Sequence, residues 1–150
     1  MTPGVDATPP IDGFGALGVR PAIEPEMAPF WAAAANGELV VERCDACGLH
    51  VFPLRGICRR CLGRAMSLVV VEPPGVLYSF TVNHHPWVPG MGPYPLGIVE
   101  VPALEDIRFV GLLAGFEDEP EIGQPVGFAF HESTAIGGLP RMHFTPWAPR

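Results

Sequence analysis

The four cysteines of the chain lie close together in the sequence, and their spacing is that of a metal site. Cys44 and Cys47 form one C-x2-C pair, and Cys58 and Cys61 form a second pair shortly after it. Two such pairs separated by a short hairpin are typical of a zinc ribbon, in which four thiolates close a tetrahedral shell. A closed shell leaves no open position for a substrate, so we expect a structural metal and not a catalytic one.

Other interpretations of these thiols stay open on the sequence alone. Two disulfides or four unrelated thiols have the same composition, and His50 could replace one sulfur. Iron in a rubredoxin-like site uses the same ligands, which leaves an electron carrier as an alternative. Paired C-x2-C turns rarely occur without metal. We therefore expect structural Zn²⁺ with these ligands: Cys44, Cys47, Cys58 and Cys61.

The charge of the chain limits its partners. It has 16 Asp and Glu residues against nine cationic ones, all of them arginine, for a formal net charge of -7. Phosphate backbones repel such a chain, which disfavours nucleic acid. Four arginines lie in or beside the cysteine region: Arg55, Arg59, Arg60 and Arg64. They could bind phosphates of a coenzyme or nucleic acid, or together with Arg43 they could offset an anionic zinc–thiolate centre.

The composition indicates a subunit of a larger assembly. Hydrophobic residues make up 48% of the chain and charged ones 17%, more apolar surface than 150 residues can bury alone. We expect a contiguous apolar patch that faces a partner. The sequence shows no secretory signal and no apolar run long enough for a bilayer, and thiols committed to metal fit a reducing cytoplasm.

The chain divides into a tail, a ribbon region and a barrel region. Residues 1–20 are rich in Pro and Gly and are expected to form a flexible tail or a linker, with a further short tail at 147–150. Residues 21–66 should contain a short helix, Met27 to Asn36, and the zinc ribbon. The helix would be anchored by Phe30 and Trp31, which could pack on the ribbon or dock a partner. Residues 67–146 should form the barrel.

Period-two patterning predicts a mainly β fold for the second half. Val76, Tyr78, Phe80 and Val82 alternate with polar or smaller neighbours, which predicts a strand with these four side chains on one face. Four more strands should follow: Leu96 to Val101, Ile107 to Leu113, Val126 to His131 and Arg141 to Phe144. Five short strands without a crossover helix favour an antiparallel barrel, and about eighty residues is the size of the five-stranded OB-fold.

The chain offers few catalytic groups of its own. His84 and His85 lie in the loop after the first barrel strand, where OB-folds commonly bind ligands, and either could be a base, a coenzyme contact or a partner-facing residue. The acidic run at 117–121 has the composition of a solvated turn. Arg141 and His143 could face a partner or water. With every thiol committed to metal, we expect no catalytic residue in this chain.

An ordered set of motifs resembles one known family, and the likeness runs from about Pro21 to Pro146. The motifs are Pro29-Phe30-Trp31, Gly37-Glu38-Leu39, Glu42-Arg43-Cys44, Cys47-Gly48, Pro53, Cys58 with Cys61, Tyr78-Ser79-Phe80-Thr81-Val82, Pro93-Tyr94-Pro95 and Ile122-Gly123-Gln124-Pro125-Val126. The chain is similar to domain-of-unknown-function family 35, a rubredoxin-like zinc ribbon followed by an acyl-CoA-associated OB-fold.

The resemblance implies a non-catalytic accessory subunit of a thiolase-superfamily enzyme. The implied partner is a lipid-transfer-protein-like aldolase in an α2β2 complex, which cleaves steroid side-chain acyl-CoA and releases propionyl-CoA. Alternative partners are a thiolase or hydroxymethylglutaryl-CoA synthase. A MaoC-type hydratase domain could precede the linker. A nucleic-acid binder built from ribbon and OB-fold remains the alternative of a different class.

If the chain is such an accessory subunit, two sets of residues are candidates for binding its ligand and its partner. The acyl-CoA ligand of the complex would be contacted by residues from Arg55, Arg59, Arg60, His84 and His85. The partner interface would use residues from Phe30, Trp31, Trp87, Tyr94, Met142 and Phe144.

Overall fold

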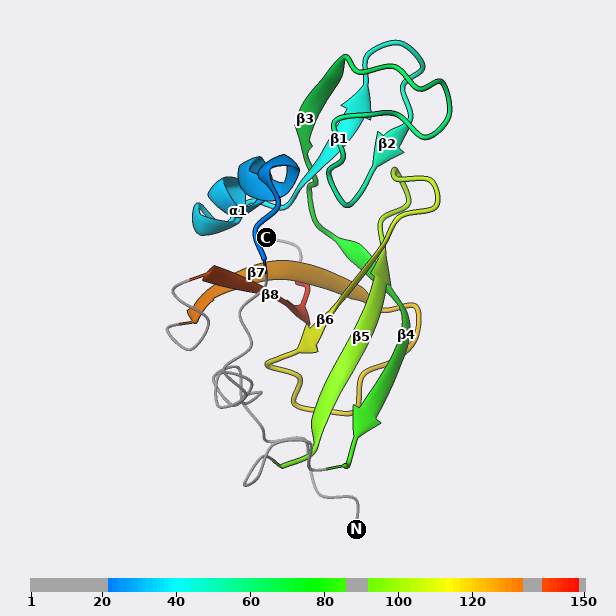
Figure 1. The fold of residues 1–150 in the computed structure, drawn as a ribbon. Coiled ribbons are helices and arrows are strands. Elements are labelled where there is room, and N and C mark those ends of the chain that lie inside the picture. Colours follow the sequence, from blue (N-terminus) through cyan, green and yellow to red (C-terminus); the bar gives the residue numbers. More distant parts are fainter. Residues whose placement is uncertain (1–21, 86–91, 134–138, 149–150) are drawn as a thin grey trace.

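A computed structural model describes residues 22–85, 92–133 and 139–148, and every structural statement below concerns these residues. A small ribbon lies at one end of a β-barrel, with a short helix beside the junction (Figure 1). The predicted tail at 1–20 and Trp87 lie outside the described residues. The elements in chain order are η2 (Pro25–Met27, a 3-10 turn), α1 (Ala28–Ala35), β1 (Val40–Cys44), β2 (His50–Val51), β3 (Met66–Val70), β4 (Gly75–Asn83), β5 (Tyr94–Glu100), β6 (Arg108–Leu113), β7 (Pro125–Ser133) and β8 (Leu139–Pro146).

The helix α1 forms where the sequence predicts it, one residue shorter at each end. Proline stands in its first turn, and Gly37, at φ 81°, ends it by donating its N–H to the carbonyl of Ala34. Phe30 and Ala34 are its buried residues. The buried side of so short a helix contributes most of its stability, because an isolated helix of this length is marginal in water.

The ribbon contains a strand that the sequence did not predict. Its sheet has the order β2-β1-β3, and β3 pairs antiparallel with β1 from Val40 opposite Val70 to Cys44 opposite Met66. The run Met66–Val70 has no clear alternation, and its pairing with β1 joins residues far apart in the sequence. Local patterning gives no signal for such a strand.

The mainly β fold is confirmed, including the closed five-stranded barrel of the OB type. Its strand order is β4-β5-β6-β8-β7. The prediction of an antiparallel barrel is corrected at one pair: β6 and β8 run parallel, with Leu112 opposite His143 and Leu113 opposite Phe144. β7 pairs with β4 and not with β6, so β8, antiparallel to β7, closes the gap between β7 and β6 and runs parallel to β6. Strand ends differ from the predicted ones by a few residues.

A β-bulge in β4 overturns the predicted face assignment of that strand. The register to β5 shifts between Leu77 and Ser79, so the intervening Tyr78 is an extra residue. Leu77 is fully buried, Tyr78 is 45% exposed, and Phe80 packs against the core, so the four side chains predicted to share one face do not share it. The guanidinium of Arg108 lies 3.8 Å over the ring of Tyr78 on the outer surface.

Helix, ribbon and barrel share one apolar core. A row of aromatic rings runs through it: Phe30 to Phe52 at 5.5 Å, Phe52 to Phe109 at 5.1 Å, Phe109 to Phe128 at 6.3 Å and Phe128 to Phe144 at 6.1 Å between centroids. Phe52 comes from the ribbon, and the last three come from the barrel. The zinc ribbon is therefore packed onto the barrel as part of one structure. None of the described helices is long and apolar enough to span a bilayer.

Candidate functional site

The ribbon gathers the four cysteine sulfurs into one cluster. All four Sγ atoms lie within 4.8 Å of one another, and Cys44 to Cys61 and Cys47 to Cys58 are each 3.5 Å apart. A tetrahedral zinc shell with Zn–S bonds of about 2.3 Å places its sulfurs about 3.8 Å apart. The arrangement fits that shell, and all four cysteines are free of disulfides.

The electrostatics of the cluster also call for a cation. Main-chain hydrogen bonding from Cys61 lowers the pKa of the Cys58 thiol to about 6. The Gly63 main chain lowers the pKa of Cys61, but the neighbouring thiols of Cys44 and Cys47 outweigh it and raise that pKa to about 11. Four thiols at this spacing cannot all ionise without a compensating charge, and a divalent metal supplies it. The donor set thus fits structural zinc, which these four residues would hold.

Both cysteine turns have the same backbone geometry, although only the first has a glycine at its left-handed position. The N–H of Gly48 bonds the carbonyl of Cys44 at 2.8 Å, and the N–H of Leu62 bonds that of Cys58 at 2.9 Å. Both donors have positive φ, 74° at Gly48 and 60° at Leu62. In the second turn the left-handed residue is therefore Leu62 and not a glycine. At Gly63 the constraint is space, because a Cβ there would crowd the Cys61 sulfur at 3.3 Å.

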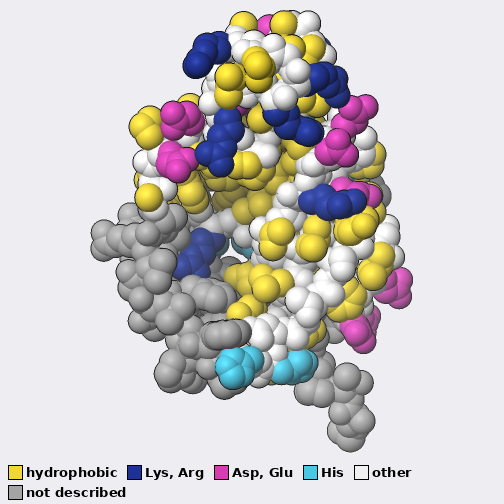
Figure 2. Space-filling model, turned by 45° about the vertical axis from the view of Figure 1, so that its right-hand side comes forward, with side chains coloured by type: hydrophobic (Ala, Val, Ile, Leu, Met, Phe, Trp, Pro, Cys, Tyr) yellow, Lys and Arg dark blue, Asp and Glu magenta, His cyan; other side chains and the backbone are white. Residues whose placement is uncertain are grey.

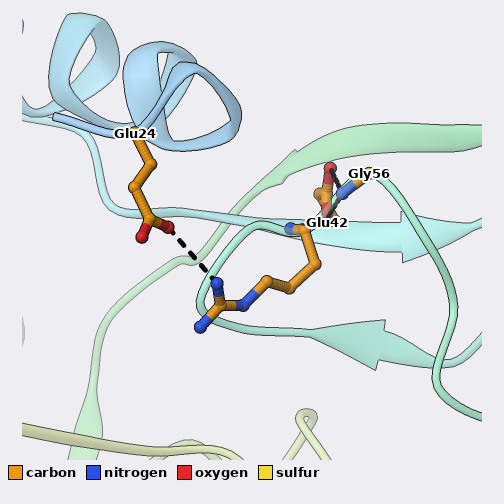
Figure 3. Close-up of polar contacts among 4 residues, drawn as sticks. Glu24, Glu42 and Gly56 are labelled. Carbon is orange, nitrogen blue, oxygen red and sulfur yellow. Dashed lines mark hydrogen bonds and ion pairs between the residues drawn. The ribbon is translucent and has the colours of Figure 1, made fainter.

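A buried carboxylate anchors the loop between the two cysteine turns. Glu42 on β1 is only 8% exposed, and its oxygens accept hydrogen bonds from the main-chain N–H groups of Arg55 at 2.8 Å and Gly56 at 3.1 Å (Figure 3). Nothing in the residue pattern distinguished Glu42 from a surface residue of an alternating strand. Its role depends on a loop that follows it by more than ten residues.

We expect Glu42→Ala to destabilise the ribbon, because two buried main-chain donors lose their acceptor. Each unsatisfied donor costs about 1–3 kcal/mol, so the free energy of unfolding should fall by about 2–4 kcal/mol. Urea denaturation of the zinc-loaded protein measures this. Glu42→Gln keeps one acceptor oxygen and should lose clearly less; equal losses in the two variants would show that the hydrogen bonds are not the cause.

Three arginines of the predicted cluster each form an ion pair with a different carboxylate. Arg55 pairs with Glu24 at 3.3 Å (Figure 3), Arg59 with Asp106 at 3.7 Å and Arg60 with Glu105 at 3.6 Å. The last two pairs join the second cysteine turn to the loop between β5 and β6. All of these groups are more than half exposed, so each pair contributes little to stability.

The structure does not bring the arginines and histidines of the predicted coenzyme site together. β4 starts next to the ribbon and ends at Asn83 at the opposite end of the barrel, and His84 and His85 follow there, both exposed (Figure 1). The Asn83 side chain accepts a hydrogen bond from the N–H of His85 at 3.0 Å. One coenzyme phosphate therefore cannot contact both groups, and the coenzyme contacts remain predictions.

Three of the predicted interface residues meet in one groove. Phe30 and Trp31 of α1 and Met142 of β8 line a hollow of about 340 Å³ that also includes Val110 and Arg141. Residues 30 and 142 are distant in the sequence, so only the fold shows their proximity. Val110 is 65% exposed, and the sequence did not indicate it as a groove residue. A single apolar residue in a strand gives no information about which residues lie beside it in space.

The interface prediction is corrected for the remaining described candidates. Phe144 is fully buried in the barrel, and Tyr94 is buried as well, with its hydroxyl 2.6 Å from the amide nitrogen of Asn83. Phe144 packs inside the barrel, 6.1 Å from Phe128 between ring centroids, so its side chain is not available to a partner.

His143 gives the barrel a pH response. Burial lowers the pKa of His143 below its ordinary value, the main chain of Arg141 opposes this, and the charge of His131 adds to the lowering. The folded state then takes up a proton at lower pH than the unfolded state. The contribution of His143 to stability is fully present above its pKa in the unfolded state and is lost as the pH falls toward its pKa in the folded state.

We expect His143→Gln to lose less free energy of unfolding between pH 7 and pH 5 than the wild type does. Urea denaturation at the two pH values measures this, and identical losses would contradict the expectation.

Family models match both parts of the chain. Residues 31–67 match the model described as "ChsH2, rubredoxin-like zinc ribbon domain", and residues 68–131 match "ChsH2, C-terminal OB-fold domain". A solved chain described as "Ltp2-ChsH2(DUF35) aldolase" is similar with a TM-score of 0.73 and 34% identity, covering 85% of this chain and 98% of that one. A DUF35 protein of unknown function from Sulfolobus solfataricus has a TM-score of 0.59 at 14% identity, covering 82% of this chain and 86% of that one, and shows the fold alone.

Two curated proteins are also similar. The "Probable enoyl-CoA hydratase alpha subunit" of Thermomonospora curvata is 37% identical over 90% of this chain. The "Benzoylsuccinyl-CoA thiolase subunit BbsA" of Thauera aromatica is 32% identical over 57% of this chain. The aligned regions span only 42% and 60% of the length of these two relatives.

Proposed function

The chain belongs to the ChsH2 (DUF35) family of zinc-ribbon and OB-fold proteins, and from that membership we propose that it is a non-catalytic accessory subunit of a thiolase-superfamily enzyme acting on acyl-CoA. The observation that carries the proposal is the structural similarity to a solved chain of an aldolase that is named for two components. The similarity covers 98% of that solved chain. The curated relative named as a thiolase subunit supports the same class of partner.

The chemistry of the described residues supports a structural contribution. All four thiols lie in the closed cysteine cluster, so no cysteine nucleophile remains. His84 and His85 are exposed at the end of the barrel remote from the arginines. The partner enzyme would therefore supply the catalytic groups, and this chain would supply contact surface and a wall of the substrate channel.

Within the proposal, the partner is an aldolase of steroid side-chain degradation in an α2β2 complex. The reaction is a retro-aldol cleavage of a β-hydroxyacyl-CoA. The bond between Cα and Cβ breaks, the hydroxyl proton leaves as the hydroxyl becomes a carbonyl, and protonation of the α-carbon releases propionyl-CoA. The alternative partner is another acyl-CoA condensing enzyme, such as a thiolase or hydroxymethylglutaryl-CoA synthase. The hydratase relative supports an upstream MaoC-type hydratase as a further component.

Co-purification tests the proposal. The tagged chain is co-expressed with each thiolase-superfamily enzyme encoded near its gene, and the products are separated by size-exclusion chromatography with light scattering. One enzyme should elute with the chain at equal stoichiometry and with a mass near two copies of each. Elution of the chain apart from every such enzyme would overturn the proposal.

A further inference from the structure

The strand β3 of the ribbon bonds to β1 through every second residue. Near one end, the N–H of Asp45 donates to the carbonyl of Ala65 at 3.0 Å. Near the other end, the N–H of Val71 donates to the carbonyl of Leu39 at 2.8 Å. The register between the two strands is continuous, and antiparallel strands alternate between residues that bond across the pair and residues that do not. The even-numbered residues of β3 therefore direct their main-chain groups away from β1.

These outward groups form an open edge of the ribbon sheet. They belong to Met66, Leu68 and Val70, and β3 is an outer strand in the order β2-β1-β3 (Figure 1). Among the residues that the structure describes, no other strand pairs with this edge. Edge strands usually carry a lysine, a proline or a bulge that prevents pairing with another strand. The run Met66–Val70 has none of these, so its edge can accept one more strand.

One face of the same edge exposes apolar side chains. Leu68 is 50% exposed and Val70 is 43% exposed. Figure 2 shows hydrophobic and arginine side chains at the surface of the ribbon, at the top of the view. Because alternate residues of a strand point to the same face, Leu68 and Val70 lie on one face. A strand added at this edge would cover both side chains and remove apolar surface from water.

The charges at the two ends of the edge are complementary to those of a second copy. Arg64 precedes Leu68 by four residues, Glu72 follows it by four, and both are exposed. Neither side chain has an ion pair or hydrogen bond among the described residues. In an antiparallel two-fold pairing centred on Leu68, opposite residues are equally distant from the centre. Arg64 of each copy then lies opposite Glu72 of the other copy, on the face that carries Leu68.

We propose that β3 pairs with β3 of a second copy of the chain, antiparallel and centred on Leu68, so that the two ribbons form one continuous sheet. Each opposite pair of outward residues exchanges two N–H···O bonds, and Leu68 of one copy contacts Leu68 of the other. Opposite charges directly across a strand pair attract, and a second copy supplies both of them by symmetry. The pairing is a property of the chain itself and does not depend on the proposed function.

Sedimentation equilibrium of the purified zinc-loaded chain tests the pairing. With rising concentration, the apparent mass should increase from 16.1 kDa toward twice that value. Leu68→Lys places two like charges at the two-fold axis and should keep the chain monomeric over the same range. Ile122→Lys is the matched control, because it makes the same change at a position that is 67% exposed and outside the ribbon. This control should associate as the wild type does.

Charge exchange between the two ends tests the register. Arg64→Glu and Glu72→Arg each place like charges opposite one another at both ends, and each should raise the dimer dissociation constant about tenfold or more. In an equimolar mixture of the two variants, a copy with two carboxylates meets a copy with two guanidinium groups, and every opposite pair is attractive. Association of the mixture should therefore return to near the wild-type value. Zinc content and melting temperature are measured for each variant to show that it is folded.

Hydrogen exchange followed by NMR locates the contact. The main-chain N–H groups of Met66 and Val70 should exchange slowly in the dimer and rapidly in the Leu68→Lys monomer. A wild type that stays monomeric at millimolar concentration would overturn the pairing. Association of Leu68→Lys like the wild type, or a mixture of charge variants that associates no better than either alone, would also overturn it.

The enzyme partner is the alternative occupant of this edge. Protection of the Met66 and Val70 N–H groups only after the enzyme is added would assign the edge to a strand of the enzyme, and the pairing of two copies would be wrong. Dimerisation of the chain is measured without any enzyme. Failure of the co-purification would therefore overturn the proposed function and leave this pairing standing, so the two proposals fail separately.

Discussion

Cys58→Ser should abolish stoichiometric zinc binding and unfold the ribbon. Cys58 is fully buried in the sulfur cluster, and a serine hydroxyl there cannot complete a shell of four thiolates. Structural zinc contributes about 10–16 kcal/mol in small zinc domains, more than the whole stability of an ordinary domain. Because the ribbon shares its core with the barrel, the melting temperature of the barrel should fall as well. Elemental analysis and thermal unfolding by circular dichroism measure the two effects.

His50→Ala is the control for this variant. His50 lies on β2 beside the first cysteine turn and is the residue that could replace a sulfur as ligand. Its substitution should leave one zinc per chain and a nearly unchanged melting temperature. Retention of zinc and a native unfolding curve in Cys58→Ser, or loss of zinc in His50→Ala, would contradict the four-cysteine site.

Phe109→Ala should have the second largest effect, a loss of about 3–5 kcal/mol in the free energy of unfolding. Phe109 is 1% exposed and contacts Phe52 of the ribbon and Phe128 of the barrel, so its removal opens a cavity where the two parts meet. Urea denaturation followed by tryptophan fluorescence and by far-ultraviolet circular dichroism measures the loss. Both probes should report one transition at lower urea.

Ile122→Ala is the matched control, because its side chain is 67% exposed and should change stability by less than about 0.5 kcal/mol. Two well-separated transitions in the wild type, with Phe109→Ala shifting only one of them, would contradict the shared core. A loss as small in Phe109→Ala as in Ile122→Ala would contradict the packing at the junction.

The structural features that depend on a few neighbouring residues could be predicted from the sequence. The two C-x2-C turns bring their own thiols together, and the period-two pattern after residue 75 reports a half-buried sheet. The helix was visible because proline, an alanine run and Asn36-Gly37 are local signals. These features come from residues within a few positions of one another, so no knowledge of distant neighbours was needed.

Features that depend on distant partners were missed. β3 forms because β1 lies beside it, and Glu42 is buried because the loop at Arg55 and Gly56 folds over it. The bulge at Tyr78 reverses the faces of its strand without any mark in the alternation. The groove joins residues 30, 110 and 141, and none of these positions indicates the other two. Their assignment required the barrel order, including the parallel pairing of β6 with β8.

The most direct test of the accessory role is steady-state turnover of a β-hydroxyacyl-CoA by three preparations: the purified chain, the purified thiolase-fold enzyme, and their complex. The assay follows formation of the shorter acyl-CoA by chromatography at matched active-site concentrations. We expect no turnover by the chain alone, and faster turnover by the complex than by the enzyme alone. Turnover of the thioester by the isolated zinc-loaded chain at an enzyme-like rate would contradict the account.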